Sequence, residues 1–185
     1  MPNATGITFG GTTIRHSYCE KVDIKTIGNA TSMAYMFNIC YSLQSVPLFN
    51  TTKVTSMQNM FQSCTSLQSV PLFNTTKVTS MQNMFQSCYS LNFIPAFITT
   101  AITSDFTTFA NNSNSLNRIL MSFNRTVALQ NCQLSKDALV EIFTNLTNRT
   151  ATTSATIDIT GNWGSSALTS ADRAIATNKN YTITG

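Results

Sequence analysis

The chain has 185 residues, 42% of them hydrophobic, which excludes a disordered chain and allows one domain with a sizeable core. Only 10% are charged, against about 25% in ordinary soluble domains, and Asn, Thr and Ser fill the polar positions. The net charge of +4 comes from scattered lysines and arginines without a basic run, so we expect no nucleic-acid partner.

Residues 1–24 are expected to form an N-terminal cap. They begin MPNATGITFGG, without the basic and apolar regions of a secretion signal, and no apolar stretch of the chain approaches the roughly 20 residues of a membrane span. We therefore expect synthesis in the cytoplasm and no membrane insertion. His16, Cys19 and Glu20 raise the alternative of a Cys-His pair or metal site, but we favour a surface histidine because zinc needs three or four ligands.

Residues 25–125 are dominated by a 24-residue repeat. The block Ser42–Cys64 recurs without a change as Ser66–Cys88, and a similar copy from Met33 onward precedes them in the same register. A period of this length is typical of solenoids, in which each unit stacks on its neighbours.

A fourth, degenerate copy follows the third. We align Phe109 with Phe85, and one inserted residue after that point brings Leu116 into register with Leu91. In this alignment Asn112 takes the position of the repeated cysteine.

Each copy is predicted to contain a helical turn and a strand. Apolar residues recur at steps of three and four between Val54 and Cys64, which indicates one face of a short helix, while Leu43, Val46 and Leu48 follow the L-x-x-V-x-L pattern of a leucine-rich-repeat strand. The predicted fold class is α/β: a leucine-rich-repeat solenoid with short parallel strands and short helices in 24-residue repeats.

Residues 126–185 are predicted to continue or cap the solenoid with strand-helix units. Ser135 is the expected N-cap of an amphipathic helix, and Thr169 with Asp172 forms the expected capping box of another. The strands are expected at Val127–Gln130, Ile157–Thr160 and Tyr181–Thr184.

The repeat resembles a known family. VTSMQNMFQSCTSLQSV, residues 54–70, is similar to the BspA-like leucine-rich repeats of bacterial surface proteins, whose signature is a V-T-x-M-x-x-M-F-x-x-C-x-x-L run before a short strand. The similarity spans roughly residues 25–120. It implies a non-enzymatic adhesion or structural role.

The C-terminal part carries a second, looser resemblance. An ITGN-G strand and turn before a helix, followed by a terminal TITG, is similar to the C-terminal units of phage tail and other virion proteins, and covers about the last 60 residues. This resemblance implies a place in a virus particle.

Stacking brings Cys40, Cys64 and Cys88 close together, which permits a disulfide or metal site. We favour a ladder of buried, reduced thiols, because each cysteine follows the apolar face by one turn and a free cysteine behaves as a small hydrophobe. The repeated methionines are likewise expected in the core.

Two sets of residues are candidates for binding. Identical loops on successive copies present the same uncharged groups and one lysine each, which suits a periodic partner bound by avidity. The alternative is a recent duplication whose loops are simply solvated. The candidates in these loops are Asn50, Thr51, Thr52, Lys53, Asn74, Thr75, Thr76 and Lys77. The second set is Phe49, Phe73 and Phe97. Strict strand alternation would expose these rings as an interface, whereas a bend after Pro47 would turn them into the core, which we slightly favour.

No motif for nucleophilic, phosphate-binding or metal chemistry is present, so we expect no enzyme activity and no cofactor. The leading functional hypothesis is a phage virion structural protein, either a capsid decoration protein or a tail or fibre component. Its partners would be other virion proteins or a host surface receptor or polysaccharide, within an oligomer or larger assembly. The alternatives are a BspA-like cell-surface adhesin and an intracellular protein-binding scaffold.

Overall fold

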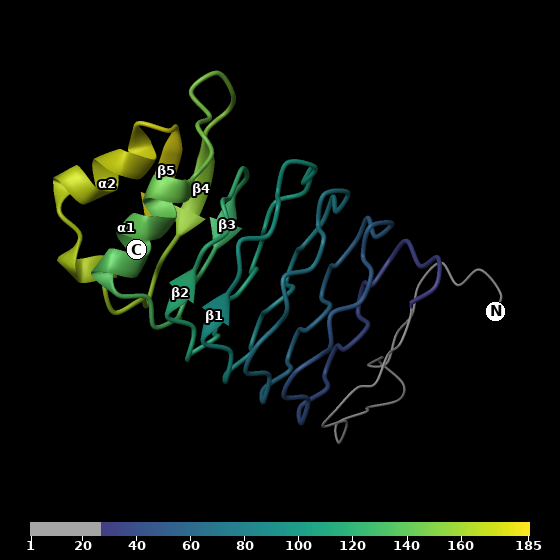
Figure 1. The fold of residues 1–185 in the computed structure, drawn as a ribbon. Coiled ribbons are helices and arrows are strands. Elements are labelled where there is room, and N and C mark those ends of the chain that lie inside the picture. Colours follow the sequence, from purple (N-terminus) through teal and green to yellow (C-terminus); the bar gives the residue numbers. More distant parts are fainter. Residues whose placement is uncertain (1–26) are drawn as a thin grey trace.

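The chain forms a row of stacked rungs closed at one end by helices. The structure, a computed structural model, describes residues 27–185. In Figure 1 successive turns of chain lie side by side from the N-terminal end of this region toward β3, and the two helices lie at the C-terminal end. One rung corresponds to one copy of the repeat.

Successive rungs are joined by backbone hydrogen bonds in the register of the repeat. Ser56 forms a parallel bridge with Ser80, which follows it by one period. The Met57 amide donates to the Ser80 carbonyl at 2.9 Å, and the Phe61 amide donates to the Met84 carbonyl at 3.0 Å. Equivalent positions of neighbouring copies therefore lie against one another, so each rung supplies hydrogen-bond partners for the next.

The predicted helical turns are absent from residues 27–116, so that prediction was wrong. Asn59 and Ser63 adopt positive φ angles of 54° and 61°, which interrupt a helix. The Met60 amide instead bonds to the Met57 carbonyl, and the Cys64 amide bonds to the Phe61 carbonyl, each three residues back. A run of tight turns thus produces the same three- and four-residue spacing of apolar side chains that a helix would.

The strands are short and parallel. The register of the first sheet places Ile94 opposite Ile119. The first sheet consists of β1 (Phe93–Ile94) and β2 (Arg118–Ile119), and the second has the order β3 (Val127–Ala128), β4 (Ala155–Asp158), β5 (Tyr181–Thr184). The last strand has the predicted bounds, whereas β4 begins two residues before the predicted one.

The helices follow their predicted caps. α1 (Lys136–Asn145) begins after Ser135, whose hydroxyl accepts from the Ala138 amide at 3.2 Å. α2 (Ser170–Thr177) begins after Thr169 and has a complete capping box with Asp172, and a 3₁₀ turn, η1 (Ser165–Ala167), precedes it. Within residues 27–185 neither helix has the length and apolar character needed to cross a membrane.

The fourth copy is shifted by one residue from its predicted alignment. The Phe85 amide bonds to the Phe109 carbonyl at 2.9 Å, whereas its counterpart Phe61 bonds to Met84. Phe109 therefore occupies the position of Met84, and Ala110 occupies that of Phe85. The alignment of Phe109 with Phe85 was wrong, although the downstream register with one inserted residue is the observed one.

The inserted residue lies farther upstream than predicted. Thr103 still bonds to Thr79 in the original register, through its amide and the Thr79 carbonyl at 3.0 Å, so the extra residue enters between Thr103 and Phe109. As a result Ser113, and not Asn112, takes the position of the repeated cysteine. Its hydroxyl donates to the Phe85 carbonyl at 2.6 Å.

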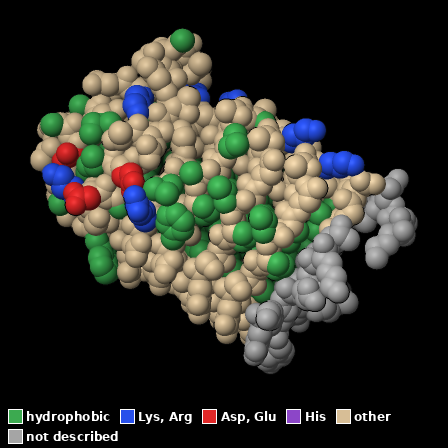
Figure 2. Space-filling view, viewed as in Figure 1, with side chains coloured by type: hydrophobic (Ala, Val, Ile, Leu, Met, Phe, Trp, Pro, Cys, Tyr) green, Lys and Arg blue, Asp and Glu red, His purple; other side chains and the backbone are tan. Residues whose placement is uncertain are grey.

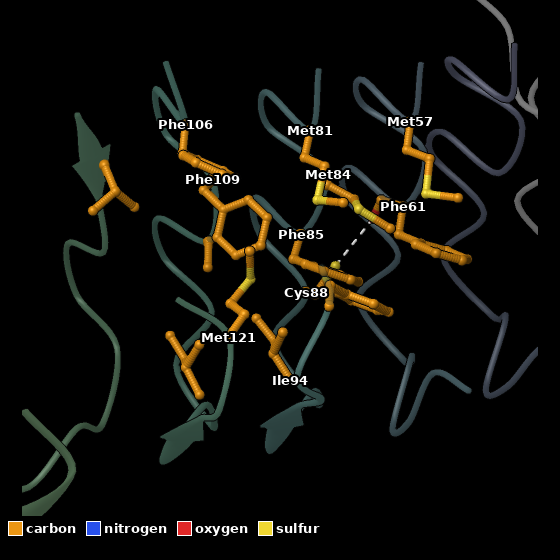
Figure 3. Packing of buried hydrophobic residues seen from close by; sticks show 14 of the residues in the cluster. Met57, Phe61, Met81, Met84, Phe85, Cys88, Ile94, Phe106, Phe109 and Met121 are labelled. Atoms are coloured by element: carbon orange, nitrogen blue, oxygen red, sulfur yellow. Dashed lines mark hydrogen bonds between the residues drawn. The ribbon is translucent and has the colours of Figure 1, made fainter. Parts of the chain in front are cut away.

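A column of side-chain donors runs through the stack at this cysteine position. Cys64 Sγ donates to the Phe37 carbonyl and Cys88 Sγ to the Phe61 carbonyl, both at 3.0 Å; the second bond is the dashed line in Figure 3. Each side chain therefore reaches back to the backbone of the preceding rung.

The same column continues into the C-terminal units. Cys132 Sγ donates to the Ala110 carbonyl at 3.3 Å, and Asn162 Nδ2 donates to the Leu129 carbonyl at 2.7 Å. Residues after 126 thus stack on the repeats by the same kind of bond, although their sequence differs.

Two columns of phenylalanine rings fill the core. The first column is Phe37, Phe61 and Phe85, and the second is Phe49, Phe73 and Phe97. Rings in the first column stack nearly parallel, at centroid distances of 5.4 and 5.7 Å. Ala110 ends this column, and Phe109 meets Phe85 edge-on at 88°, as Figure 3 shows. The repeated methionines and cysteines are buried beside these columns, and the cysteines among residues 27–185 form no disulfide with one another.

Candidate binding face

The loops proposed as a polar array use much of their hydrogen-bonding capacity internally. Thr51 and Thr75 are buried, and their hydroxyls donate to the carbonyls of Asn74 and Ile98 in the following rung, both at 2.8 Å. The prediction of these two threonines as binding residues was wrong, because their side chains join neighbouring rungs.

The exposed asparagines of these loops close their own turns. Asn50 Oδ1 accepts from the Thr52 amide at 3.0 Å and from its hydroxyl at 2.7 Å, and Asn74 holds Thr76 in the same way. Such side-chain turns hold the loop conformation. Lys53 Nζ also donates to Asn29 in the preceding rung at 2.7 Å. Much of the predicted array therefore stabilises the loops, although Thr52, Lys53, Thr76 and Lys77 are solvent-exposed.

The second candidate set is in the core. Phe49, Phe73 and Phe97 are 5%, 2% and 3% exposed, so these rings cannot serve as an exposed aromatic interface. The reason is a tight bend: the Phe73 amide bonds to the Pro71 carbonyl at 3.0 Å, and the corresponding bond of Phe97 to Pro95 is 2.8 Å. The bend turns the phenylalanine inward and the residue before it outward.

That reversal exposes a row of apolar side chains. Leu48, which strict strand alternation would place in the core, is 67% exposed, and its equivalent Leu72 is 59% exposed. Phe93 and Ile98 are also exposed in the next rung. Figure 2 shows hydrophobic side chains gathered in a band across the rungs on the side that carries β1 and β2. We call the surface of segments 44–50, 68–74 and 92–98, with the exposed residues Leu48, Leu72, Phe93 and Ile98, the hydrophobic face.

The row of leucines ends at a small surface hollow. Position 96 is the equivalent of Leu48 and Leu72 but carries alanine. A hollow of about 270 Å³ lies there, lined by Leu72, Phe73, Asn74, Ala96 and Ile98. The exchange of leucine for alanine thus leaves an apolar recess next to a projecting apolar side chain.

The hydrophobic face carries no formal charge. Segments 44–50 and 68–74 are both QSVPLFN, and segment 92–98 is NFIPAFI. In the following rung Arg118 is paired with Glu141 of α1, with Arg118 Nη2 and Glu141 Oε1 2.8 Å apart. The hydrogen bond from Arg118 lowers the pKa of the Glu141 carboxyl, which favours the charged form of the pair.

Comparison with known proteins identifies the repeat. The model of one family, described as Mycoplasma protein of unknown function, DUF285, matches residues 11–123. The chain belongs to this family. DUF285 is a repeat family related to the BspA-like surface repeat proteins, so the predicted resemblance is confirmed at that level. No curated protein and no solved structure matches the chain, and the resemblance of the C-terminal part to virion proteins stays a prediction.

Residues 27–185 contain no group of three or more His, Cys, Asp and Glu side chains arranged to hold a metal ion. Burial raises the pKa of the Cys88 thiol, and raises that of Cys132 to about 12, so both are protonated and poor nucleophiles at neutral pH. The predicted surface histidine, His16, lies outside the described residues together with Cys19 and Glu20.

The sequence of the DUF285 repeats contained a signal for the hydrophobic face in the same proline bend that was expected to turn the phenylalanines inward. Proline precedes the exposed leucine in both identical copies, as Pro47 before Leu48 and Pro71 before Leu72. Proline cannot supply an amide to a strand ladder, so a bend at this point is the expected result. Such a bend exchanges the inward and outward positions that follow it.

Proposed function

We propose that this protein is a non-enzymatic binding protein, a leucine-rich-repeat-type solenoid of the BspA-like surface class, that binds a partner protein through its hydrophobic face. The observation that carries the proposal is the row of exposed apolar side chains at Leu48, Leu72, Phe93 and Ile98 on rigid, cross-bonded rungs. Contiguous exposed apolar surface is typical of interaction sites.

The composition of the face favours a protein partner. Interface cores are depleted in charged residues and enriched in aromatic and large apolar ones, which describes segments 44–50, 68–74 and 92–98. A polysaccharide partner would instead require exposed hydrogen-bonding groups. The side-chain oxygens of Asn50 and Asn74 already accept hydrogen bonds from Thr52 and Thr76.

A binding experiment with a matched pair of variants tests the proposal. Beads coated with the protein would be applied to cultured epithelial cells, and the bound beads counted. Leu72→Asp places a charge on the hydrophobic face, whereas Thr79→Asp adds the same charge at an exposed position of the same rung outside segment 68–74. We expect Leu72→Asp to lower binding about tenfold and Thr79→Asp to leave it within twofold, with both variants keeping the wild-type circular dichroism.

Two outcomes would count against the proposal. Equal binding by wild type and Leu72→Asp would remove the hydrophobic face from the contact, and binding that survives trypsin treatment of the cells would indicate a partner other than a protein. A failure of wild-type beads to bind would remove the adhesin role on these cells.

The virion hypothesis predicts that the protein is found in a different place and that its hydrophobic face contacts a different partner. As a decoration or tail protein, the chain would bind neighbouring virion proteins, whereas an adhesin would be found in the envelope fraction of its cell. Mass spectrometry of purified virions and of envelope fractions separates these two roles. Relation to surface repeat proteins favours the adhesin.

A further inference from the structure

We propose that the occupant of the hydrophobic face is a second copy of this chain, docked about a two-fold axis that passes through Leu72. This inference rests on the proposed binding function of the face and adds a second copy of the chain to the proteins that the face binds. It follows from the order of residues at one repeat position, which reads Leu48, Leu72, Ala96 across three neighbouring rungs.

The three positions form a row across neighbouring rungs. The ring centroids of Phe49 and Phe73, one residue further along, are 4.9 Å apart, and those of Phe73 and Phe97 are 6.3 Å apart, so each step is close to or slightly above the spacing of hydrogen-bonded strands. Leu72 and Ala96 line the same hollow, so the row continues across the next rung.

A two-fold axis through the middle of this row makes the face self-complementary. In such a contact, residue i of one copy meets residue j of the other, and j meets i. Rotation about Leu72 brings Leu48 of each copy opposite Ala96 of its partner. A projecting leucine, 67% exposed, then meets the hollow of about 270 Å³ on both sides of the axis. Two copies of Leu72 pack against one another at the centre.

Electrostatics favours the same occupant. Each copy carries a net charge of +4, yet segments 44–50, 68–74 and 92–98 have no charged residue, so two copies meet without like charges in contact. A partner with a charged surface would have to desolvate its charges against this face without gaining an ion pair. An uncharged apolar surface of the same shape, which the second copy supplies, avoids that cost.

The area of the face sets the strength of the contact. Stable interfaces use about 20–30 residues on each side, whereas the exposed apolar row has four large side chains. We therefore expect a weak dimer that sedimentation detects at high protein concentration, and a dissociation constant that falls slightly as salt screens the net charge of the two copies.

Cysteine cross-linking tests the geometry directly. In a Cys19→Ser background, Leu72→Cys lies on the axis and should form an inter-chain disulfide under mild oxidation. Leu48→Cys alone should not form one. Residue 48 of one copy and residue 48 of the other lie on opposite sides of the axis, two rung spacings or about 10 Å apart, which is beyond the reach of a disulfide. A mixture of Leu48→Cys and Ala96→Cys proteins should again cross-link.

Variants of Ala96, which lines the hollow, separate this inference from the proposed function. Ala96→Leu fills the recess and should weaken dimerisation at least tenfold in sedimentation, whereas Ala96→Ser should leave it within about threefold. Because Ala96→Leu keeps the face apolar, beads carrying it should still bind cells if the face binds other proteins.

Two results would overturn the dimer. One is cross-linking of Leu72→Cys that is no faster than that of Leu48→Cys, and the other is a wild-type protein that stays monomeric up to about 1 mM. If either of these results is found and Leu72→Asp still loses cell binding, the dimer is wrong but the proposed function of the hydrophobic face is supported.

Discussion

Cys88 Sγ lies 3.0 Å from the carbonyl oxygen of Phe61 in the preceding rung and donates a hydrogen bond to it. The Phe61 carbonyl also accepts the Cys64 amide at 3.0 Å, so one acceptor serves both a turn within its rung and a contact between rungs. The same arrangement with Ser113 in the next rung shows that the position selects a small donor and not a thiol as such.

The first prediction concerns this donor. Cys88→Ser keeps a small donor, whereas Cys88→Ala removes it and leaves a small void in the core. We expect urea unfolding to show a loss of about 1–2 kcal/mol for Cys88→Ala, from the lost hydrogen bond and packing, and less than about 1 kcal/mol for Cys88→Ser. Equal losses in the two variants would show that the hydrogen bond contributes nothing beyond packing.

The second prediction is a loss of stability in alkali. Burial raises the pKa of the Cys132 thiol from 9.0 to about 12, so the unfolded chain loses this proton at a lower pH than the folded one. The stabilisation is therefore fully present below pH 9 and is lost as the pH rises toward 12. Urea midpoints measured from pH 8 to pH 11 should fall for the wild type and fall less for Cys132→Ser; parallel curves would contradict this.

The third prediction concerns thiol accessibility. Cys40, Cys64, Cys88 and Cys132 are buried, and burial raises the pKa of Cys88 as well. A thiol reagent at neutral pH should label these four slowly in native protein and quickly in denaturant, with peptide mass spectrometry assigning each site. Rapid native labelling of Cys64 or Cys88 would show that the rungs open.

The fourth prediction concerns acid. Hydrogen bonds from Lys136 and then from Thr169 lower the pKa of Asp172 from 3.8 to about 2. The stabilisation is present above pH 3.8 and is lost as the pH falls toward 2, because the folded carboxylate resists protonation that the unfolded one accepts. The thermal midpoint of the wild type should therefore fall as the pH is lowered from 3.8 toward 2, and that of Asp172→Asn should fall less. The Asp137→Asn variant, whose acid lies in the first turn of α1, is the control.

The fifth prediction tests the stacking. Deletion of Ser42–Thr65 joins Tyr41 to Ser66 in the register of the repeat and should leave a folded protein that is shorter by one rung. Its near-ultraviolet circular dichroism should persist, with a lower thermal midpoint because one set of inter-rung contacts is lost. An unfolded product would show that the rungs are not interchangeable units.

The 24-residue repeat alone predicts the period, the register of the three clear copies and the burial of the methionine and cysteine ladders. An apolar residue that recurs every 24 positions must fall at one place in every rung. The sequence also predicted the caps of α1 and α2 at Ser135 and Thr169, because capping depends on a few adjacent residues.

The conformation between those fixed points was decided by tertiary structure. Steps of three and four residues fit both a helical turn and a run of tight turns. Only bonds to the next rung, such as that from Met57 to Ser80, select the second. The bend at Pro71 likewise reversed Leu72 and Phe73, so the exposed row at Leu48 and Leu72 arose where alternation predicted core. Side-chain direction in an irregular segment depends on each backbone angle, and these angles are set by hydrogen bonds between residues far apart in the chain.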